Sequence, residues 1–189
     1  LEAMDMLIRA GCVRYTAAGG FPSWRMVDSI HRSGLHNQAR LEALQAEYSL
    51  ASRAGREPEA IAMCREHRLG FLARSPLAGG FLAQRPVSVR ELINLDRDWK
   101  NERFGSNVGD AVLKVLAKIA DKRPATPAQI AVAWVLRNPQ VTSAVISAPA
   151  ARELRELMRA TDISLSADET GALVNVTTVQ DPRMELRHV

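Results

Sequence analysis

The stretch TPAQIAVAWVLRNPQVTSAVI, residues 126–146, decides the fold, because it joins one helix directly to one strand. Thr126 is a favourable N-cap, and Pro127 suits the first helical position, where its missing N–H costs nothing. Asn138 and Pro139 end the helix, since the residue before a proline is pushed out of the helical region. Residues 141–146 then have the composition of a short strand. The stretch therefore predicts one helix–strand unit of an α/β protein.

The same alternation of strand and helix extends through most of the chain. Strands are predicted at residues 13–18, 41–48 and 69–73. Helical spacing and end signals predict a first helix at residues 1–10, which Gly11 ends, and a second at 23–34, which Gly34 closes. A third helix is predicted to start at residue 57, and further helices at 89–95, 107–120, 151–160 and 167–174. Such alternation predicts parallel strands with right-handed crossovers, but periodicity leaves a barrel and a doubly wound sheet both open.

Composition excludes several classes of function. The 25 basic residues are dispersed among 21 acidic ones, which disfavours a nucleic-acid surface although the net charge is +4. No apolar run is long enough to cross a membrane, and no secretory leader is visible. Cys12 and Cys64 lack metal-binding spacing, which favours two reduced thiols. We therefore expect a cytoplasmic protein without membrane or nucleic-acid partners.

Four motifs resemble those of the aldo-keto reductase family. Residues 126–136 are similar to its Thr-Pro-Ala-Gln helix, and RSPLAGGFL, residues 74–82, to its Ser-Pro-Leu-x-x-Gly-x-Leu loop. LEAMDMLIRAGCVRY, residues 1–15, and LQAEYSLASR, residues 44–53, resemble a helix–strand unit and a strand of that family. The resemblance implies the carboxyl-terminal half of a (β/α)8 TIM barrel over residues 1–176, followed by a loose polar tail at 177–189. The first helix begins without Met or a capping residue, so we expect a segment upstream of it.

The resemblance also implies the chemistry of an NADP-dependent carbonyl reductase. The Asp, Tyr, Lys and His of the family's catalytic tetrad would lie before the stretch that matches residue 1, so we assign no catalytic residue here. The chain alone is expected to be inactive. Tyrosines and histidines considered as substitutes have plainer interpretations, as packing residues (Tyr15, Tyr48) or as surface residues near helix ends (His31, His36, His67).

Cofactor contacts implied by the resemblance fall in two stretches. Gln45 matches a glutamine that binds the nicotinamide amide, with a strand-end residue bonded to backbone as the alternative. Arg74 stands where the family has the aromatic residue that stacks under the nicotinamide. Ser75, Pro76, Leu77 and Gly80 match the family's loop that lies along the pyrophosphate. The alternative is that they form a plain turn.

Several departures from the family pattern fall in the same predicted pocket. Gly19 and Gly20 replace a Ser-Asn pair that holds the carboxamide, and residues 147–151 lack the lysine and the hydroxyl that the family has after its last strand to hold a 2′-phosphate. Leu157 replaces an asparagine, and Arg152 is either a phosphate ligand or part of a solvated helix start. These departures predict weak or absent NADPH binding.

Two alternatives to the enzymatic interpretation therefore stay open. The first is a non-catalytic remnant or subunit that associates with itself or with a complementary half barrel, because four strands leave two open edges. The second is a ligand-binding or structural half barrel with no nucleotide.

Overall fold

The computed structural model describes residues 1–52, 57–83 and 107–178. Four strands form one sheet in the order β1-β2-β3-β4, and every neighbouring pair is parallel. The strands are β1 (Thr16–Gly19), β2 (Leu41–Glu47), β3 (Gly70–Arg74) and β4 (Val141–Val145). The predicted α/β class with parallel strands is confirmed, and the arrangement is consistent with part of a (β/α) barrel.

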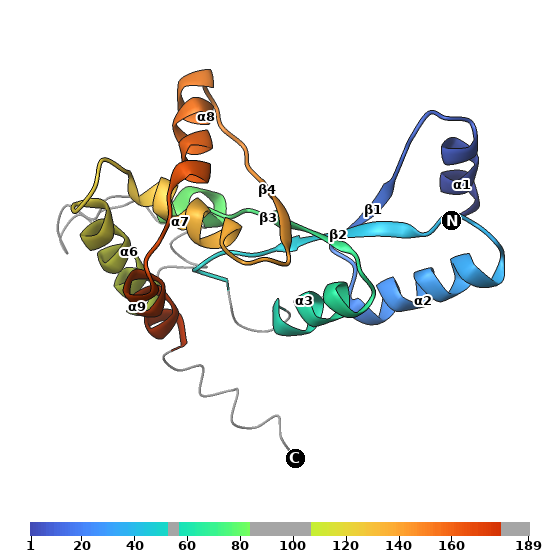
Figure 1. The fold of residues 1–189 in the computed structure, drawn as a ribbon, viewed down its shortest axis with the longest axis horizontal. Coiled ribbons are helices and arrows are strands. Elements are labelled where there is room, and N and C mark those ends of the chain that lie inside the picture. Colours follow the sequence, from blue (N-terminus) through green and yellow to red (C-terminus); the bar gives the residue numbers. More distant parts are fainter. Residues whose placement is uncertain (53–56, 84–106, 179–189) are drawn as a thin grey trace, which may run out of the picture.

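Helices separate the strands and follow the last of them (Figure 1). The α-helices are α1 (Glu2–Arg9), α2 (Ser23–Leu35), α3 (Glu57–Glu66), α6 (Asn107–Ala120), α7 (Pro127–Leu136), α8 (Ala151–Met158) and α9 (Ala167–Thr178). Two 3₁₀ segments, η1 (Ala78–Ala83) and η2 (Arg159–Asp162), complete the described elements. Helices α2 and α3 lie side by side along the sheet, and α6 packs against α7 and α9. No described helix combines the length and apolar character needed to span a lipid bilayer.

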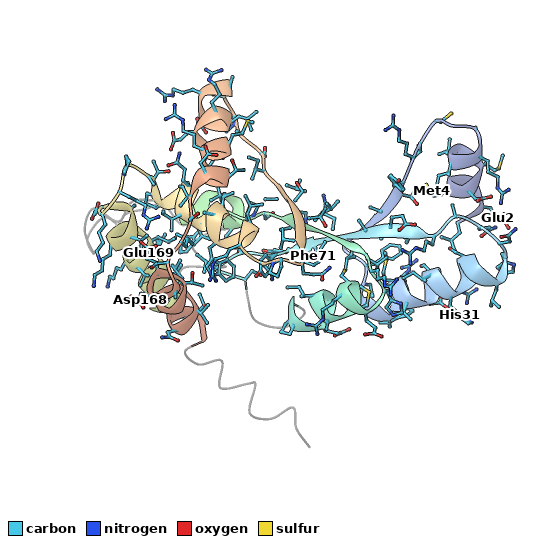
Figure 2. All side chains as sticks on the ribbon, viewed as in Figure 1. Glu2, Met4, His31, Phe71, Asp168 and Glu169 are labelled. Atoms are coloured by element: carbon cyan, nitrogen blue, oxygen red, sulfur yellow. The ribbon has the colours of Figure 1, made fainter. Side chains whose placement is uncertain are left out.

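The two faces of the sheet have different environments. Leu44 and Phe71 are register partners and are fully buried on the face that the helices cover. Figure 2 shows Phe71 at the middle of the sheet. Because successive side chains alternate between faces, their neighbours Gln45 and Leu72 lie on the opposite face. Both are only partly buried, and Ser143, beside Leu72 on β4, is exposed. One face of the sheet is thus partly open over the described residues.

Helix α7 is buried on all sides rather than along one stripe. Residues 127–135 are all buried, as expected for an apolar helix enclosed by the sheet and by other helices. Trp134 stacks on Tyr48 with ring centroids 5.3 Å apart, and the Tyr48 ring meets Phe71 edge-on at 5.9 Å. The Tyr48 hydroxyl accepts a hydrogen bond of 3.0 Å from Asn138 Nδ2. Tyr48 is therefore a packing residue, as expected.

Two predicted boundaries were wrong, each for a local reason. β1 begins at Thr16 rather than at residue 13, because the N–H groups of Cys12 and Val13 bond back to the Leu7 carbonyl. Tyr15 consequently precedes the strand and is 75% exposed, so its predicted packing role is also wrong. Gly34 lies inside α2, and Asn37, with φ of 50°, adopts the left-handed conformation just beyond the helix instead.

The carboxyl-terminal helix is longer than expected. It runs to Thr178 rather than to residue 174, and the Thr177 hydroxyl donates to the Leu173 and Val174 carbonyls within the helix. The predicted Ser166–Glu169 capping box is present: Ser166 Oγ accepts from the Glu169 N–H, and the Glu169 carboxylate accepts from the Ser166 N–H. The predicted helix at 89–95 and the remainder of the tail lie outside the described residues.

Cys12 and Cys64 are not joined by a disulfide bond. Cys12 is exposed, whereas Cys64 is fully buried on α3. Burial disfavours the charged thiolate and raises the pKa of Cys64 to about 11. Cys64 is therefore an inert core residue near neutral pH.

Candidate functional site

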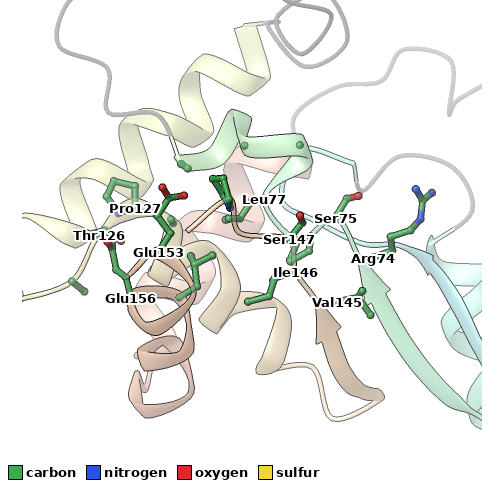
Figure 3. A pocket seen from close by; sticks show the side chains of 18 residues that line it. Arg74, Ser75, Leu77, Thr126, Pro127, Val145, Ile146, Ser147, Glu153 and Glu156 are labelled. Atoms are coloured by element: carbon green, nitrogen blue, oxygen red, sulfur yellow. The ribbon is translucent and has the colours of Figure 1, made fainter. Parts of the chain in front are cut away.

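A pocket of about 970 Å³ opens at the carboxyl ends of β3 and β4. Segment η1 and helices α7 and α8 form its other walls (Figure 3). In parallel α/β sheets, ligands bind at the carboxyl ends of strands, where loops and helix N-termini converge. Both helices direct their N-terminal residues at this pocket, Thr126 and Pro127 from α7 and Glu153 from α8.

The loop after β3 supplies one wall of the pocket. Arg74, Ser75, Pro76, Leu77 and Gly80 all line it, so the structure brings these predicted residues together. Their adjacency in sequence explains this, because one short loop carries them all.

This loop is a run of tight turns. Ser75 and Ala78 have φ of 55° and 50°, a left-handed conformation that costs a residue with a side chain about 1–2 kcal/mol. Gly80, with φ of 99°, adopts its conformation without that cost. The Ala78 N–H donates to the Ser75 carbonyl and the Gly80 N–H to the Leu77 carbonyl, both at 2.9 Å. These two N–H groups are thus used within the loop, and Arg74 and Ser75 are the loop residues whose polar side chains line the pocket.

The N-terminus of α7 is held by a residue that sequence analysis missed. Gln129 is 5% exposed and completes a capping box with Thr126: each backbone N–H donates to the other residue's side-chain oxygen, at 2.8 and 3.3 Å. Gln129 Nε2 also donates to the backbone carbonyl of Glu156 on α8, at 2.7 Å. The Thr-x-x-Gln spacing signals the box, but only the fold reveals the bond that ties α7 to α8.

Charges in the pocket are separated. Among the described residues that line it, Arg74 is the one cation, and Glu153 and Glu156 are the carboxylates. Figure 3 shows Arg74 at the strand end of the pocket and both glutamates beside α7 and α8, at the other end. Arg152 is exposed and is not among the lining residues, which favours the solvated helix start over a phosphate ligand.

Gln45 lies outside this pocket, on the partly open face of the sheet. It is the register partner of Gly19 and of Leu72, and its carbonyl accepts from the Gly20 N–H at 2.9 Å. A Cβ atom added to Gly19 would lie 3.5 Å from Gln45 Oε1. By strand alternation Gln45 shares a face with Leu72 and Arg74, so it extends the polar surface from the pocket along the sheet.

The remaining candidates contribute no chemistry to the pocket. His31 and His36 are exposed on and just after α2, and Figure 2 shows His31 on the outer side of that helix. Within the described ranges, no group of three or more His, Cys, Asp or Glu side chains is placed to hold a metal ion.

The pocket has the size and the lining of a small-molecule site. Ligand sites typically have volumes of about 300–1,000 Å³, with apolar walls and a few polar groups. Leu77, Ile146 and Leu157 provide apolar wall, and the hydroxyls of Ser75 and Ser147 lie between the two charged ends (Figure 3). An elongated ligand with flat rings joined by an anionic link matches that layout.

Comparison with known proteins gives a consistent picture. The sequence model described as "Aldo/keto reductase family" matches residues 1–177. An "Uncharacterized oxidoreductase YrpG" of Bacillus subtilis is 29% identical over 171 residues, which cover 88% of this chain and 50% of that protein. "Aldo-keto reductase dtxS3" of Metarhizium robertsii is 28% identical over 89% of this chain and 45% of its own. A "Probable voltage-gated potassium channel subunit beta" of Arabidopsis thaliana is 33% identical over 63% of this chain and 38% of its own. The chain thus spans about half the length, or less, of these curated relatives.

Proposed function

Because the chain belongs to the aldo/keto reductase family, we propose that it forms the cofactor-binding side of a nicotinamide-dependent oxidoreductase barrel. The pocket at the carboxyl ends of β3 and β4 is the observation that carries this proposal. When bound, the cofactor supplies the hydride for reduction of a carbonyl group. The resemblance implies that this cofactor is NADP. The charges that line the pocket bear on whether NADP or NAD is bound.

Different residues of the pocket contact different parts of the cofactor. The Arg74 guanidinium and the hydroxyls of Ser75 and Ser147 hold the anionic pyrophosphate, since charge-assisted hydrogen bonds are the stronger ones. Leu77 and Ile146 cover apolar ring surface. Gln45, on the adjoining sheet face, binds the nicotinamide amide through its side-chain amide.

The chain by itself is not expected to reduce a carbonyl. The family's proton-donating groups have no assigned counterpart here, and the titratable residues among the described lining are Arg74, Glu153 and Glu156. The acid–base groups would come from outside these residues, which makes turnover a property of a more complete assembly.

A titration of the purified chain tests the proposal. NADH and NADPH are added separately, and binding is followed by quenching of tryptophan emission and by isothermal titration calorimetry. We expect saturable binding of at least one dinucleotide, weakened about tenfold by Arg74→Ala because a charge-assisted contact to phosphate is lost. Arg137→Ala is the matched control, since Arg137 is exposed at the end of α7, outside the pocket.

Two results would contradict the proposal. Absence of saturable binding by both dinucleotides would remove the cofactor role. Clear NADPH oxidation with 4-nitrobenzaldehyde by the wild-type chain alone would show that the proton-donating groups are already present.

A second candidate function is association through the sheet. β1 and β4 are the outer strands of the described sheet, and unpaired strand edges and open sheet faces favour pairing with another chain. The similarity to a protein named as a potassium channel subunit beta further supports this alternative. We expect a dimer or larger species, formed with a second copy or with a complementary half barrel. Analytical ultracentrifugation checks this, and a monomer at all concentrations would argue against self-association.

A further inference from the structure

The end of the pocket formed by α8 is acidic. Glu153 and Glu156 are three residues apart on one helix, a spacing that places side chains on the same face, and both line the pocket. Glu153 is exposed and Glu156 is partly buried, so both carboxylates reach solvent or ligand. Neither forms an ion pair with another described residue.

Four arginines near this end lie outside the described lining of the pocket. Arg152 and Arg155 are exposed on α8 and are absent from the described lining. Arg123 pairs with Glu169. Arg159 and Arg123 face a neighbouring hollow, together with Asp121 and Glu156. The remaining cation of the pocket, Arg74, is at its far end (Figure 3).

This polarity orients a dinucleotide. On the proposed function, its nicotinamide half lies near Gln45, and its pyrophosphate lies along Arg74 and the Ser75 loop. The adenosine half then extends toward α7 and α8, which places its ribose beside Glu153 and Glu156.

The two forms of the cofactor differ at that ribose. A free 2′-hydroxyl can donate a hydrogen bond to a carboxylate, and such charge-assisted bonds are about twice as strong as neutral ones. A phosphate monoester carries about −1.5 to −2 charge at pH 7 and accepts rather than donates hydrogen bonds. Two carboxylates in the wall of the pocket, with the one cation of its described lining at the far end, would therefore repel a 2′-phosphate.

We propose that Glu153 and Glu156 make the pocket selective for a dinucleotide with a free 2′-hydroxyl, so that NADH binds more tightly than NADPH. The inference rests on the proposed cofactor-binding function, and it assigns a specificity role to two residues that the sequence motifs did not single out. It also agrees with the absence, at the corresponding positions of residues 147–151, of the lysine and the hydroxyl with which the family holds a 2′-phosphate.

Comparative titration of the two cofactors tests this selectivity. We expect NADH to bind the wild-type chain at least about tenfold more tightly than NADPH in low salt, because the like charges of the carboxylates and the 2′-phosphate repel each other at short range. The double variant Glu153→Gln and Glu156→Gln should reduce the ratio to about threefold or less, mainly by strengthening NADPH binding. Glu153→Lys should bring the two affinities together or reverse their order.

Controls separate charge from structure. Glu66→Gln removes an exposed carboxylate from α3, outside the pocket, and should leave the ratio unchanged. Glu156→Gln keeps the backbone carbonyl that accepts from Gln129, and circular dichroism checks that each variant is folded. If NADPH binds the wild-type chain as tightly as NADH, or if the double variant keeps the wild-type ratio, the inference is overturned while the proposed function stands. If neither cofactor binds, both fail together.

Discussion

Replacing Trp134 by alanine is expected to lower the free energy of unfolding by about 3–5 kcal/mol, the usual range for deleting a large buried aromatic side chain. Trp134 is 6% exposed and stacks on Tyr48, with an angle of 22° between the rings. Its removal leaves a cavity between α7 and the chain after β2 and takes away an aromatic neighbour of Tyr48. Such aromatic pairs contribute beyond their buried area, by about 0.5–1.5 kcal/mol.

Urea denaturation followed by far-ultraviolet circular dichroism measures this loss. Trp24→Ala is the matched control, because Trp24 is 69% exposed on α2 and its removal should change stability by less than about 1 kcal/mol. Equal losses for the two variants would mean that the Tyr48–Trp134 stack contributes nothing particular to the core.

Replacing Gln129 by leucine is expected to cost about 2–4 kcal/mol. The change removes one half of the capping box, worth about 1 kcal/mol, and the interhelical bond to Glu156. It also leaves a carbonyl without its donor, and an unsatisfied buried polar group costs about 1–3 kcal/mol. Because α7 and α8 both line the pocket, dinucleotide affinity should fall along with stability.

Thr126→Ala separates the two contributions of Gln129. It removes only the Oγ1 acceptor of the cap and leaves the Gln129–Glu156 bond in place, so about 1 kcal/mol should be lost. The difference between the two variants in urea denaturation then measures the α7–α8 link. Identical losses would show that the capping interaction accounts for the whole effect and that the link is dispensable.

Local signals in the sequence were enough for the elements whose ends depend on nearby residues. Thr126 and Pro127 begin α7 as predicted, and Ser166 and Glu169 cap α9. Local rules failed where a second residue could also end the helix. Gly34 was predicted to close α2, but the helix continues to Leu35 and Asn37 makes the left-handed turn.

The site was predictable in part for the same reason. Arg74 and Ser75 could be placed in one pocket because they belong to one contiguous loop. Gln45 could not be placed relative to that loop, since its position depends on the register between β2 and β3. Glu153 and Glu156 escaped prediction because the face that α8 turns to the pocket is set by packing of Leu157 against Ala128 and Val132 of α7.

The strand order β1-β2-β3-β4 has a consequence for how such a sheet can change in evolution. Every strand lies beside the strands that precede and follow it along the chain, so a further strand–helix module can be joined at either margin without rethreading those already in place. Duplication, fusion and splitting of genes at module boundaries are therefore topologically simple for this architecture.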